Sequence, residues 1–300
     1  MPEKAVHLSP QTASAFLPAE DDAARRHIVD RLIQERCPSF VSHWSWPVVR
    51  PVLYRMLGYG KARAMADTLA SLSGEQSFEY LTQALEVDLT LHHLDRLPSS
   101  GRMIVAANHP TGLADGVAVW DAIRRVRRDV VFFANADAIR VNPAFSDVVI
   151  PVEWVLDKRS PTKTRETLRL AAQAFAEEKC VVIFPSGKLA REIDGHLTEQ
   201  DWYPTVVSLA RKQAAPIVPL NLKARNSRLY YTLARLNGEL RDITLFHELL
   251  NKKRSHFELT FGPLVPTDAL AGDAKAVTDA LKTHVAYRLA DAPHTLFGGV

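Results

Sequence analysis

From about residue 75 onward, short apolar runs alternate with longer segments whose apolar residues recur at helical spacing. The runs are short enough for strands and apolar enough to be buried on both faces of a sheet. Strands that alternate with helices along a chain build an α/β domain around a largely parallel sheet. The predicted strands are Leu89–Leu94, Met103–Ala107, Asp129–Ala134, Val148–Val155, Cys180–Phe184, Pro216–Leu222 and His256–Phe261. The sequence therefore predicts a largely parallel central sheet flanked by helices.

Helical periodicity is found between these strands and also before them. The predicted helices of the sheet region are Gly112–Val126, Thr162–Glu178, Pro204–Gln213 and Ala274–Leu289. An apolar repeat from Asp21 to about Cys37 predicts an earlier helix, ahead of the first strand. We therefore divide the chain into an N-terminal helical segment, residues 1–75, and a domain formed by residues 76–300.

Aromatic and basic residues are interleaved between this first helix and residue 75. The aromatic residues are Trp44, Trp46, Tyr54 and Tyr59, and the basic residues are Arg50, Arg55, Lys61 and Arg63. Two prolines, Pro47 and Pro51, are expected to break a helix here. Two interpretations stay open, because such a segment suits either an interfacial helix on anionic lipid or a helix packed on the following domain.

Composition restricts the class of protein. The formal net charge is only +3, so the total charge does not indicate nucleic-acid binding, and none is expected. The two cysteines, Cys37 and Cys180, form neither a disulfide framework nor a metal-ligand spacing, which favours a reducing compartment. The start of the chain lacks the pattern of a signal peptide, and no stretch approaches the roughly 18 apolar residues of a membrane span.

The segment IVAANHPTGLADG, residues 104–116, places His109 directly after a predicted strand. Ligands of open α/β sheets bind at the carboxyl ends of the strands. Asp115 follows six residues later, in the first turn of the next predicted helix, where its carboxylate can reach one imidazole nitrogen. That contact would make the other nitrogen a stronger base, and the start of the helix offers N–H groups to a phosphate or an oxyanion. A purely structural or capping role is the alternative.

The segment VVIFPSGKLAR, residues 181–191, repeats this arrangement at the end of another buried strand. Ser186 and Gly187 predict a turn whose backbone N–H groups can approach an anion. Lys188 and Arg191 can neutralise a phosphate, and arginine does so with two parallel donors. A plain turn with solvated cations is the alternative interpretation of this segment.

Together the two segments resemble the glycerolipid acyltransferase family, which includes lysophosphatidic acid acyltransferases. The family combines an Asn-His turn followed by Asp with a later Phe-Pro-x-Gly block followed by basic residues. With five residues between His109 and Asp115, the chain is most similar to the hemolysin-like branch, which includes ornithine-lipid acyltransferases. DKR at residues 157–159 and APIVPLNLKARNS at residues 215–227 resemble two further blocks, so the likeness covers about residues 80–265.

The resemblance implies a glycerolipid acyltransferase-like fold and the transfer of a fatty acyl group from a thioester. The donor would be acyl-coenzyme A or acyl carrier protein, and the acceptor the hydroxyl or amine of a lysophospholipid-like or amino-acid lipid. His109 would be the general base and Asp115 would orient it, while Gly187 and nearby backbone N–H groups would stabilise the tetrahedral oxyanion or position phosphate. The residues implied in substrate binding are Asn108, Arg159, Ser186, Gly187, Lys188 and Arg191.

No cofactor is expected, because the acyl donor is a substrate, and no metal is expected, because no two-His, two-Cys or carboxylate cluster has metal-ligand spacing. The expected location is the cytoplasm, peripheral on the inner face of the cytoplasmic membrane. The basic cluster Arg124–Arg128 fits either a dock for an acidic carrier protein or a solvated helix end.

The chain departs from the family in its second motif, because the family often has Glu where Ser186 stands and the branch often has Glu where Lys188 stands. This change of charge favours a more acidic acceptor. Two other functions stay open: a thioester hydrolase on the same scaffold, with His109 activating water, and a non-catalytic protein that binds lipid or acyl carrier protein.

Overall fold

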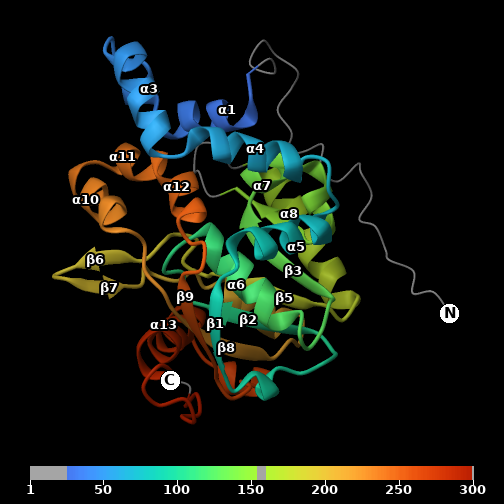
Figure 1. Cartoon of the computed structure of the whole chain (residues 1–300). Helices are drawn as coiled ribbons and strands as arrows, with labels where there is room; N and C mark the ends of the chain where they lie inside the picture. Colours follow the sequence, from blue (N-terminus) through green and yellow to red (C-terminus); the bar gives the residue numbers. More distant parts are fainter. Residues whose placement is uncertain (1–25, 154–159, 299–300) are drawn as a thin grey trace.

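The computed structural model describes residues 26–153 and 160–298. Its main sheet has seven strands in the order β1-β9-β8-β2-β5-β3-β4 (Figure 1). The strands are β1 (Asp88–His92), β2 (Met103–Ala107), β3 (Val130–Asn135), β4 (Val149–Val152), β5 (Cys180–Ile183), β8 (Ile217–Lys223) and β9 (His256–Phe261). Neighbouring strands are parallel except for the antiparallel pair β8 and β9. The prediction of a largely parallel sheet is confirmed.

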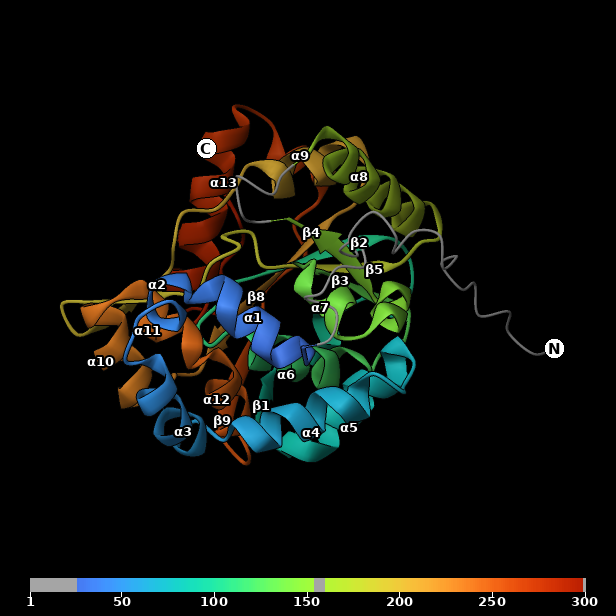
Figure 2. The same ribbon diagram turned by 90° about the horizontal axis from the view of Figure 1, so that it is seen from above.

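Helices cover both faces of this sheet (Figure 2). On β2, Val105 and Ala107 pack on one face and Ile104 and Ala106 on the other, because successive side chains of a strand point in opposite directions. One face is covered by α5 (Gly74–Leu85) and α6 (Leu113–Ile123), and the other by α8 (Pro161–Ala176), α9 (Thr205–Lys212) and α13 (Ala274–Thr283). Burial on both faces explains why the central strands are apolar without alternation.

The ends of most elements lie close to the predicted residues, with two differences near the edges of the sheet. β4 ends at Val152, and residues 154 and 155 of the predicted strand lie outside the described residues. The last helix does not stay α-helical to Leu289, because after Thr283 it continues as a π-helical turn, His284–Arg288. Val285 lies in that turn, and its carbonyl oxygen accepts a hydrogen bond of 2.8 Å from Asn221 of β8.

From residue 26, where the described part begins, four helices precede α5. These are α1 (Ile28–Arg36), α2 (Pro38–Val41), α3 (Trp46–Met56) and α4 (Tyr59–Leu69). The expectation that prolines break the segment is wrong, because α3 starts with Pro47 in its first turn and runs through Pro51. Both prolines are exposed. The Pro47 carbonyl, which loses its helical donor at Pro51, therefore faces solvent and can be hydrated.

These helices share an apolar core with residues from far along the chain. Val29, Ile33 and Ala66 pack with Ile243, at the end of α11 (Gly238–Ile243). On α3, Leu53 and Tyr54 pack against this core. α3 is thus packed on the rest of the protein along one side, as expected if this segment is a helix packed on the following domain.

The other side of α3 is apolar and open to solvent. Its most exposed apolar side chains are Val48 (76%), Val52 (62%) and Met56 (65%), and Trp44 just before the helix is 84% exposed. The spacing of four residues puts the three helical side chains in one stripe. The packing interpretation thus describes one side of this helix, and the interfacial interpretation of its open side stays a prediction.

The proposed domain boundary at residue 75 falls inside the first turn of α5, so the division into 1–75 and 76–300 stays a prediction. No helix in the described part of the chain is long and apolar enough to cross a membrane.

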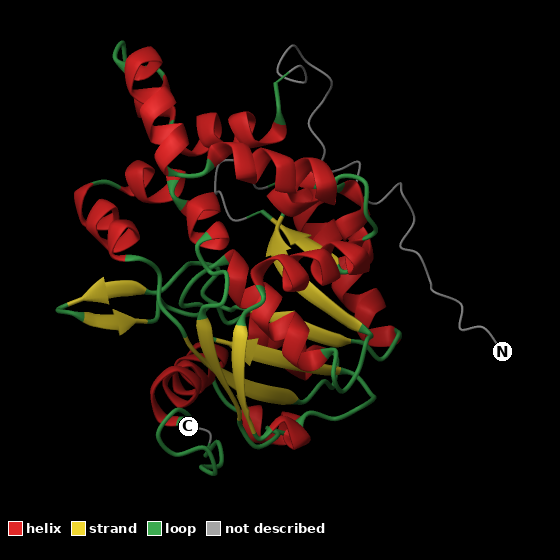
Figure 3. Ribbon diagram, viewed as in Figure 1, coloured by secondary structure: helices red, strands yellow, loops and turns green. Residues whose placement is uncertain are grey.

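The sequence-based prediction missed a hairpin and the helices that follow β8. The hairpin joins β6 (Arg191–Ile193) and β7 (His196–Thr198), and it projects from the sheet domain (Figure 3). Asp194 and Gly195 form its tip, with φ of 49° and 80° as the two-residue turn of a twisted hairpin requires. The missed helices include α10 (Arg228–Leu236), α11 and α12 (Leu245–Leu250).

A pair of glycine substitutions tests this packing. A Cβ at Gly74 would lie 2.8 Å from the Ala144 carbonyl oxygen and 2.8 Å from Val148 Cγ2, whereas a Cβ at Gly60 would meet nothing within 4 Å. We expect Gly74→Ala to lower the free energy of unfolding by about 1–3 kcal/mol through overpacking. Gly60→Ala, in exposed helix, should leave it unchanged or raise it by up to about 1 kcal/mol. Denaturant unfolding measures both, and equal effects would contradict the packing at Gly74.

Candidate active site

His109 lies in the turn that leaves the carboxyl end of β2. Its Nδ1 is 2.9 Å from Asp115 Oδ2, so the contact expected from the spacing is present. An ionised carboxylate accepts a hydrogen bond from Nδ1–H, and this tautomer has its lone pair on Nε2. The imidazole is partly buried, with 16% of the side chain exposed. This geometry suits a general base that a ligand can reach through Nε2.

Asp115 is fully buried at the start of α6 and accepts four hydrogen bonds. Besides His109 Nδ1, the donors are Thr111 N at 2.8 Å, Gly112 N at 2.9 Å and the Thr111 hydroxyl. The N-terminal end of a helix favours a negative charge. The carboxylate is therefore fixed in orientation. The N–H groups at the start of this helix were predicted to bind a phosphate or an oxyanion. Those of Thr111 and Gly112 donate to the Asp115 carboxylate instead.

Asn108 ties the same turn to the neighbouring strand. Its Nδ2 donates to the Leu222 carbonyl oxygen at 2.9 Å, and its Oδ1 accepts from Leu222 N at 2.7 Å. The side chain thus continues the pairing of β2 with β8 after the β2 backbone has turned away. Asn108 was expected to bind substrate, but the structure places its amide on β8, where it positions His109.

The loop after β5 packs directly on the imidazole. The Phe184 ring stacks on the His109 ring with centroids 4.3 Å apart and planes 23° apart. Ala190 N donates to the His109 carbonyl oxygen at 2.9 Å, and a Cβ at Gly112 would lie 3.1 Å from Leu189. The two motifs therefore meet at one edge of the sheet, because β2 and β5 are parallel neighbours.

Ser186 and Gly187 shape this second loop from inside. Ser186 is fully buried, and its hydroxyl donates to the Lys188 carbonyl oxygen at 2.7 Å. Gly187 has a φ of 58°, and its N–H donates to the Phe184 carbonyl oxygen at 2.9 Å. The expectation that the Gly187 N–H stabilises an oxyanion is wrong in this conformation, because the turn itself uses that donor.

The predicted cations lie at the surface of the same loop. Lys188 is exposed, and Arg191 is exposed at the first position of β6. Arg159, the third predicted cation, lies outside the described residues. Lys188 and Arg191 can thus meet an anionic group from solvent while the buried part of their loop supports His109.

The segment that resembles a further block, residues 215–227, forms β8 and a third loop beside the site. Asn226 donates from Nδ2 to the Thr111 carbonyl oxygen at 3.3 Å. The next residue, Ser227, donates from its N–H to Glu248 Oε2 at 2.8 Å, and the same carboxylate pairs with buried Lys252 at 3.0 Å. A buried ion pair between Glu248 of α12 and Lys252, just after that helix, therefore anchors the loop that supports the turn around Asp115.

Sequence reasoning missed Glu199, which lies two residues from Asp201 and three from Trp202. Its Oε2 accepts from His109 N at 3.1 Å, and its Oε1 accepts from Trp202 Nε1 at 3.0 Å. Burial raises the pKa of this carboxyl above its usual value. A single glutamate after an unpredicted hairpin carries no spacing signal.

The Arg124–Arg128 cluster is held by contacts within the protein. Arg127 is buried and binds Asp129 at 2.6 Å as well as the carbonyl oxygens of Gly101 and Glu178. Arg124 and Arg125 both bind Asp121. These contacts favour a helix end over a dock for a carrier protein.

Within residues 26–153 and 160–298, no three His, Cys, Asp or Glu side chains gather as a metal site would require. Both cysteines are buried, and burial raises the pKa of the Cys37 and Cys180 thiols to about 12. Neither sulfur is therefore a thiolate nucleophile near neutral pH.

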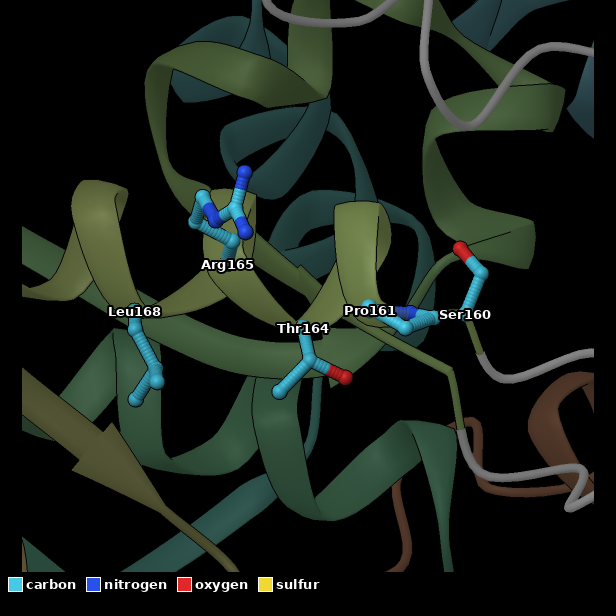
Figure 4. Close-up of a pocket in the computed structure, with 5 residues that line it drawn as sticks. All are labelled: Ser160, Pro161, Thr164, Arg165 and Leu168. Carbon is cyan, nitrogen blue, oxygen red and sulfur yellow. The ribbon is translucent and has the colours of Figure 1, made fainter.

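A hollow of about 560 Å³ lies at the start of α8 (Figure 4). Its lining residues are Ser160, Pro161, Thr164, Arg165 and Leu168. They follow residues 154–159, which lie outside the described part. Of the predicted site residues that the structure describes, none lines this hollow.

Comparison with known proteins gives a sequence family for the sheet domain. Residues 88–223, which include His109, Asp115 and the second loop, match the sequence model of the family described as Acyltransferase. This region is an acyltransferase domain, and the chain is an enzyme of the acyltransferase class.

Two relatives carry a more specific description, lyso-glycine lipid O-acyltransferase. The protein from Phocaeicola vulgatus is 24% identical over 199 residues, covering 64% of this chain and 70% of its own length. The protein from Bacteroides thetaiotaomicron is 19% identical over 252 residues, covering 82% and 90%. Among solved structures, the 1-acyl-sn-glycerophosphate acyltransferase PlsC from Thermotoga maritima aligns with a TM-score of 0.46 and 12% identity, over 87% of this chain and 93% of that one.

The substitution Asp115→Asn tests the hydrogen bonds that hold the turn. An amide would turn an N–H group toward one of the four donors, so we expect the free energy of unfolding to fall by about 1–3 kcal/mol. The matched control is Asp121→Asn on the same helix, whose partners are the more exposed Arg124 and Arg125. Thermal unfolding of both variants measures the difference, and equal stability of D115N and wild type would contradict the network.

Proposed function

We propose that the protein transfers a fatty acyl group from a thioester to the hydroxyl of a lysolipid, with His109 as the general base. The observation that carries this proposal is the Nδ1–Asp115 contact of 2.9 Å within residues that match the acyltransferase family. Acyl-coenzyme A and acyl carrier protein are both suitable donors. Transfer to an amine is the same chemistry with a different acceptor atom.

In the proposed reaction, His109 Nε2 takes the proton of the acceptor hydroxyl as its oxygen attacks the thioester carbonyl carbon. Asp115 stabilises the imidazolium that forms. The tetrahedral intermediate then collapses, the C–S bond breaks, and the leaving thiolate takes the proton from His109. General-base assistance of this kind contributes roughly 10²–10⁴-fold in rate. No covalent enzyme intermediate is needed, which fits the two buried thiols.

We propose an acceptor with an anionic head group. Two relatives are described as lyso-glycine lipid O-acyltransferases, and a glycine acylated on its nitrogen keeps a free carboxylate. The exposed Lys188 and Arg191 lie on the loop that packs against His109, where they can pair with such a carboxylate or with a phosphate. We assign Arg159 the same task. Ser186, being buried, shapes the loop and does not contact the head group.

We also propose that the protein works at the surface of the cytoplasmic membrane, on its inner face. The exposed stripe Val48, Val52 and Met56, with Trp44 beside it, supports this proposal. Arg50 and Arg55 on the same helix are exposed and can pair with anionic lipid. A lipid acceptor would then reach the site from the membrane without passing through water.

The substitution His109→Ala tests the catalytic proposal. We expect the wild type to form an acylated lysolipid from acyl-coenzyme A or acyl carrier protein, and H109A to be slower by about 10²-fold or more. Mass spectrometry of the lipid product and assay of the released thiol measure both halves of the reaction. The control is His92→Ala at the end of β1, which runs antiparallel to β2 and ends at the opposite edge of the sheet.

The same assay separates the alternatives. Thiol release without acylated product in the wild type would identify a hydrolase. Binding of thioester without turnover of any kind would identify a non-catalytic protein. Full activity of H109A would exclude His109 as the base.

The double substitution Val48→Glu with Val52→Glu tests the membrane proposal. Burying one such side chain in lipid contributes up to about 1.5–3 kcal/mol, so two charged replacements should weaken binding to anionic vesicles by more than about tenfold. Both side chains are exposed, so the melting temperature should not change. Vesicle co-sedimentation of the full chain measures binding. Unchanged binding would show that another surface contacts the membrane.

A further inference from the structure

Glu199 is a buried acid beside His109 that the proposed reaction does not use. It follows β7 directly and is only 6% exposed. A buried carboxyl group is costly unless hydrogen bonds or a nearby positive charge compensate its desolvation. Its position in an enzyme of this class therefore calls for a specific role, and the role inferred below rests on the function proposed above.

The contacts of Glu199 join three separate segments of the site. Its oxygens accept from His109 N in the first loop, at 3.1 Å, and from Trp202 Nε1 ahead of α9, at 3.0 Å. An interaction with the Ser186 side chain in the second loop also acts to lower the pKa of this carboxyl. Since Ala190 N holds the His109 carbonyl oxygen, both backbone groups of the histidine are fixed by residues 184–199. The backbone position of His109 thus depends on this carboxylate.

The charge of Glu199 acts on the imidazole as well. His109 becomes positive when it takes the acceptor's proton, and a buried negative charge nearby is screened little by water. The donors around the carboxylate favour its ionised form, whereas burial raises its pKa. As pH falls, Glu199 therefore loses its charge at a higher pH than an ordinary glutamate.

Other titratable groups lie around Glu199 on α6, in the π-helical turn, on α13 and in the loop just after Glu199 itself. Asp115 of α6 binds Nδ1 of the same His109. The Tyr287 hydroxyl accepts from Glu199 N at 3.2 Å, from the π-helical turn. Nearby, Asp201 pairs with Lys282 of α13 at 2.8 Å, so these two charges largely offset each other. Among the described residues that pack around His109, Glu199 is thus a second acid, besides Asp115, whose negative charge acts on the imidazole.

We propose that Glu199 is a positioning residue, which holds His109 and the Ser186 turn together and favours the protonated imidazole that forms during acyl transfer. Asp115 orients the ring through Nδ1, and Glu199 orients the backbone that carries the ring. Two carboxylates thereby act on one base through different atoms.

The test is an NMR titration of the His109 imidazole in the full chain, with its signal assigned by its loss in H109A. Glu199→Gln keeps the shape and removes the charge, so the titration midpoint should move to lower pH than in the wild type. The matched control, Glu166→Gln, removes a glutamate that pairs with Arg169 on the outer helix α8, and should leave the midpoint unchanged. An unchanged midpoint in folded E199Q would overturn the electrostatic part of the proposal.

Glu199→Asp tests the positioning part, because it keeps the charge but shortens the reach by one methylene. We expect a midpoint near that of the wild type, a kcat lower by about 10- to 100-fold and a nearly unchanged KM. A wild-type kcat in folded E199D would overturn the positioning part. If E199Q does not fold, E199D still tests that part of the proposal. The titration needs no turnover, so an inactive wild type would refute the proposed function alone, while an unmoved midpoint would refute the role of Glu199 alone.

Discussion

The buried carboxylate of Asp115 is the interaction on which the site depends. Four donors converge on its two oxygens, and one of them is the imidazole of His109. The other three are groups of Thr111 and Gly112, so the same carboxylate closes the turn and starts α6. Asp115 therefore has two roles, because the carboxylate that caps the start of α6 also orients the imidazole of His109.

The parallel sheet brings the remaining parts to the same place. β2, β5 and β8 are neighbours that run in one direction, so the loops after their carboxyl ends meet at one edge. Asn108 joins the first loop to β8, Phe184 stacks on the imidazole, and Asn226 supports the Thr111 carbonyl. Each loop contacts at least one other, so the position of His109 depends on all three loops at this edge of the sheet.

Sequence alone predicted the parts of the site whose evidence is local. β2 begins and ends at the predicted residues because a strand buried on both faces is a short, wholly apolar run. The His109–Asp115 contact spans six residues and follows from one turn. Glu199 is 90 residues from His109, and no local pattern reports such a pair. The Gly187 donor was misassigned for a related reason, since its partner Phe184 depends on the conformation of the turn.

The hairpin β6–β7 connects two residues of the site to each other. Its first arm begins at Arg191, on the loop that carries Lys188, and its second arm leads directly into Glu199. Side chains along a strand alternate between faces. Lengthening one arm by a single residue would therefore shift the pairing and reverse the direction in which the side chains at one end of the hairpin point. Adding a pair of residues, one to each arm, would preserve both ends. The hairpin can therefore change its length by one residue in each arm without moving Arg191 or Glu199.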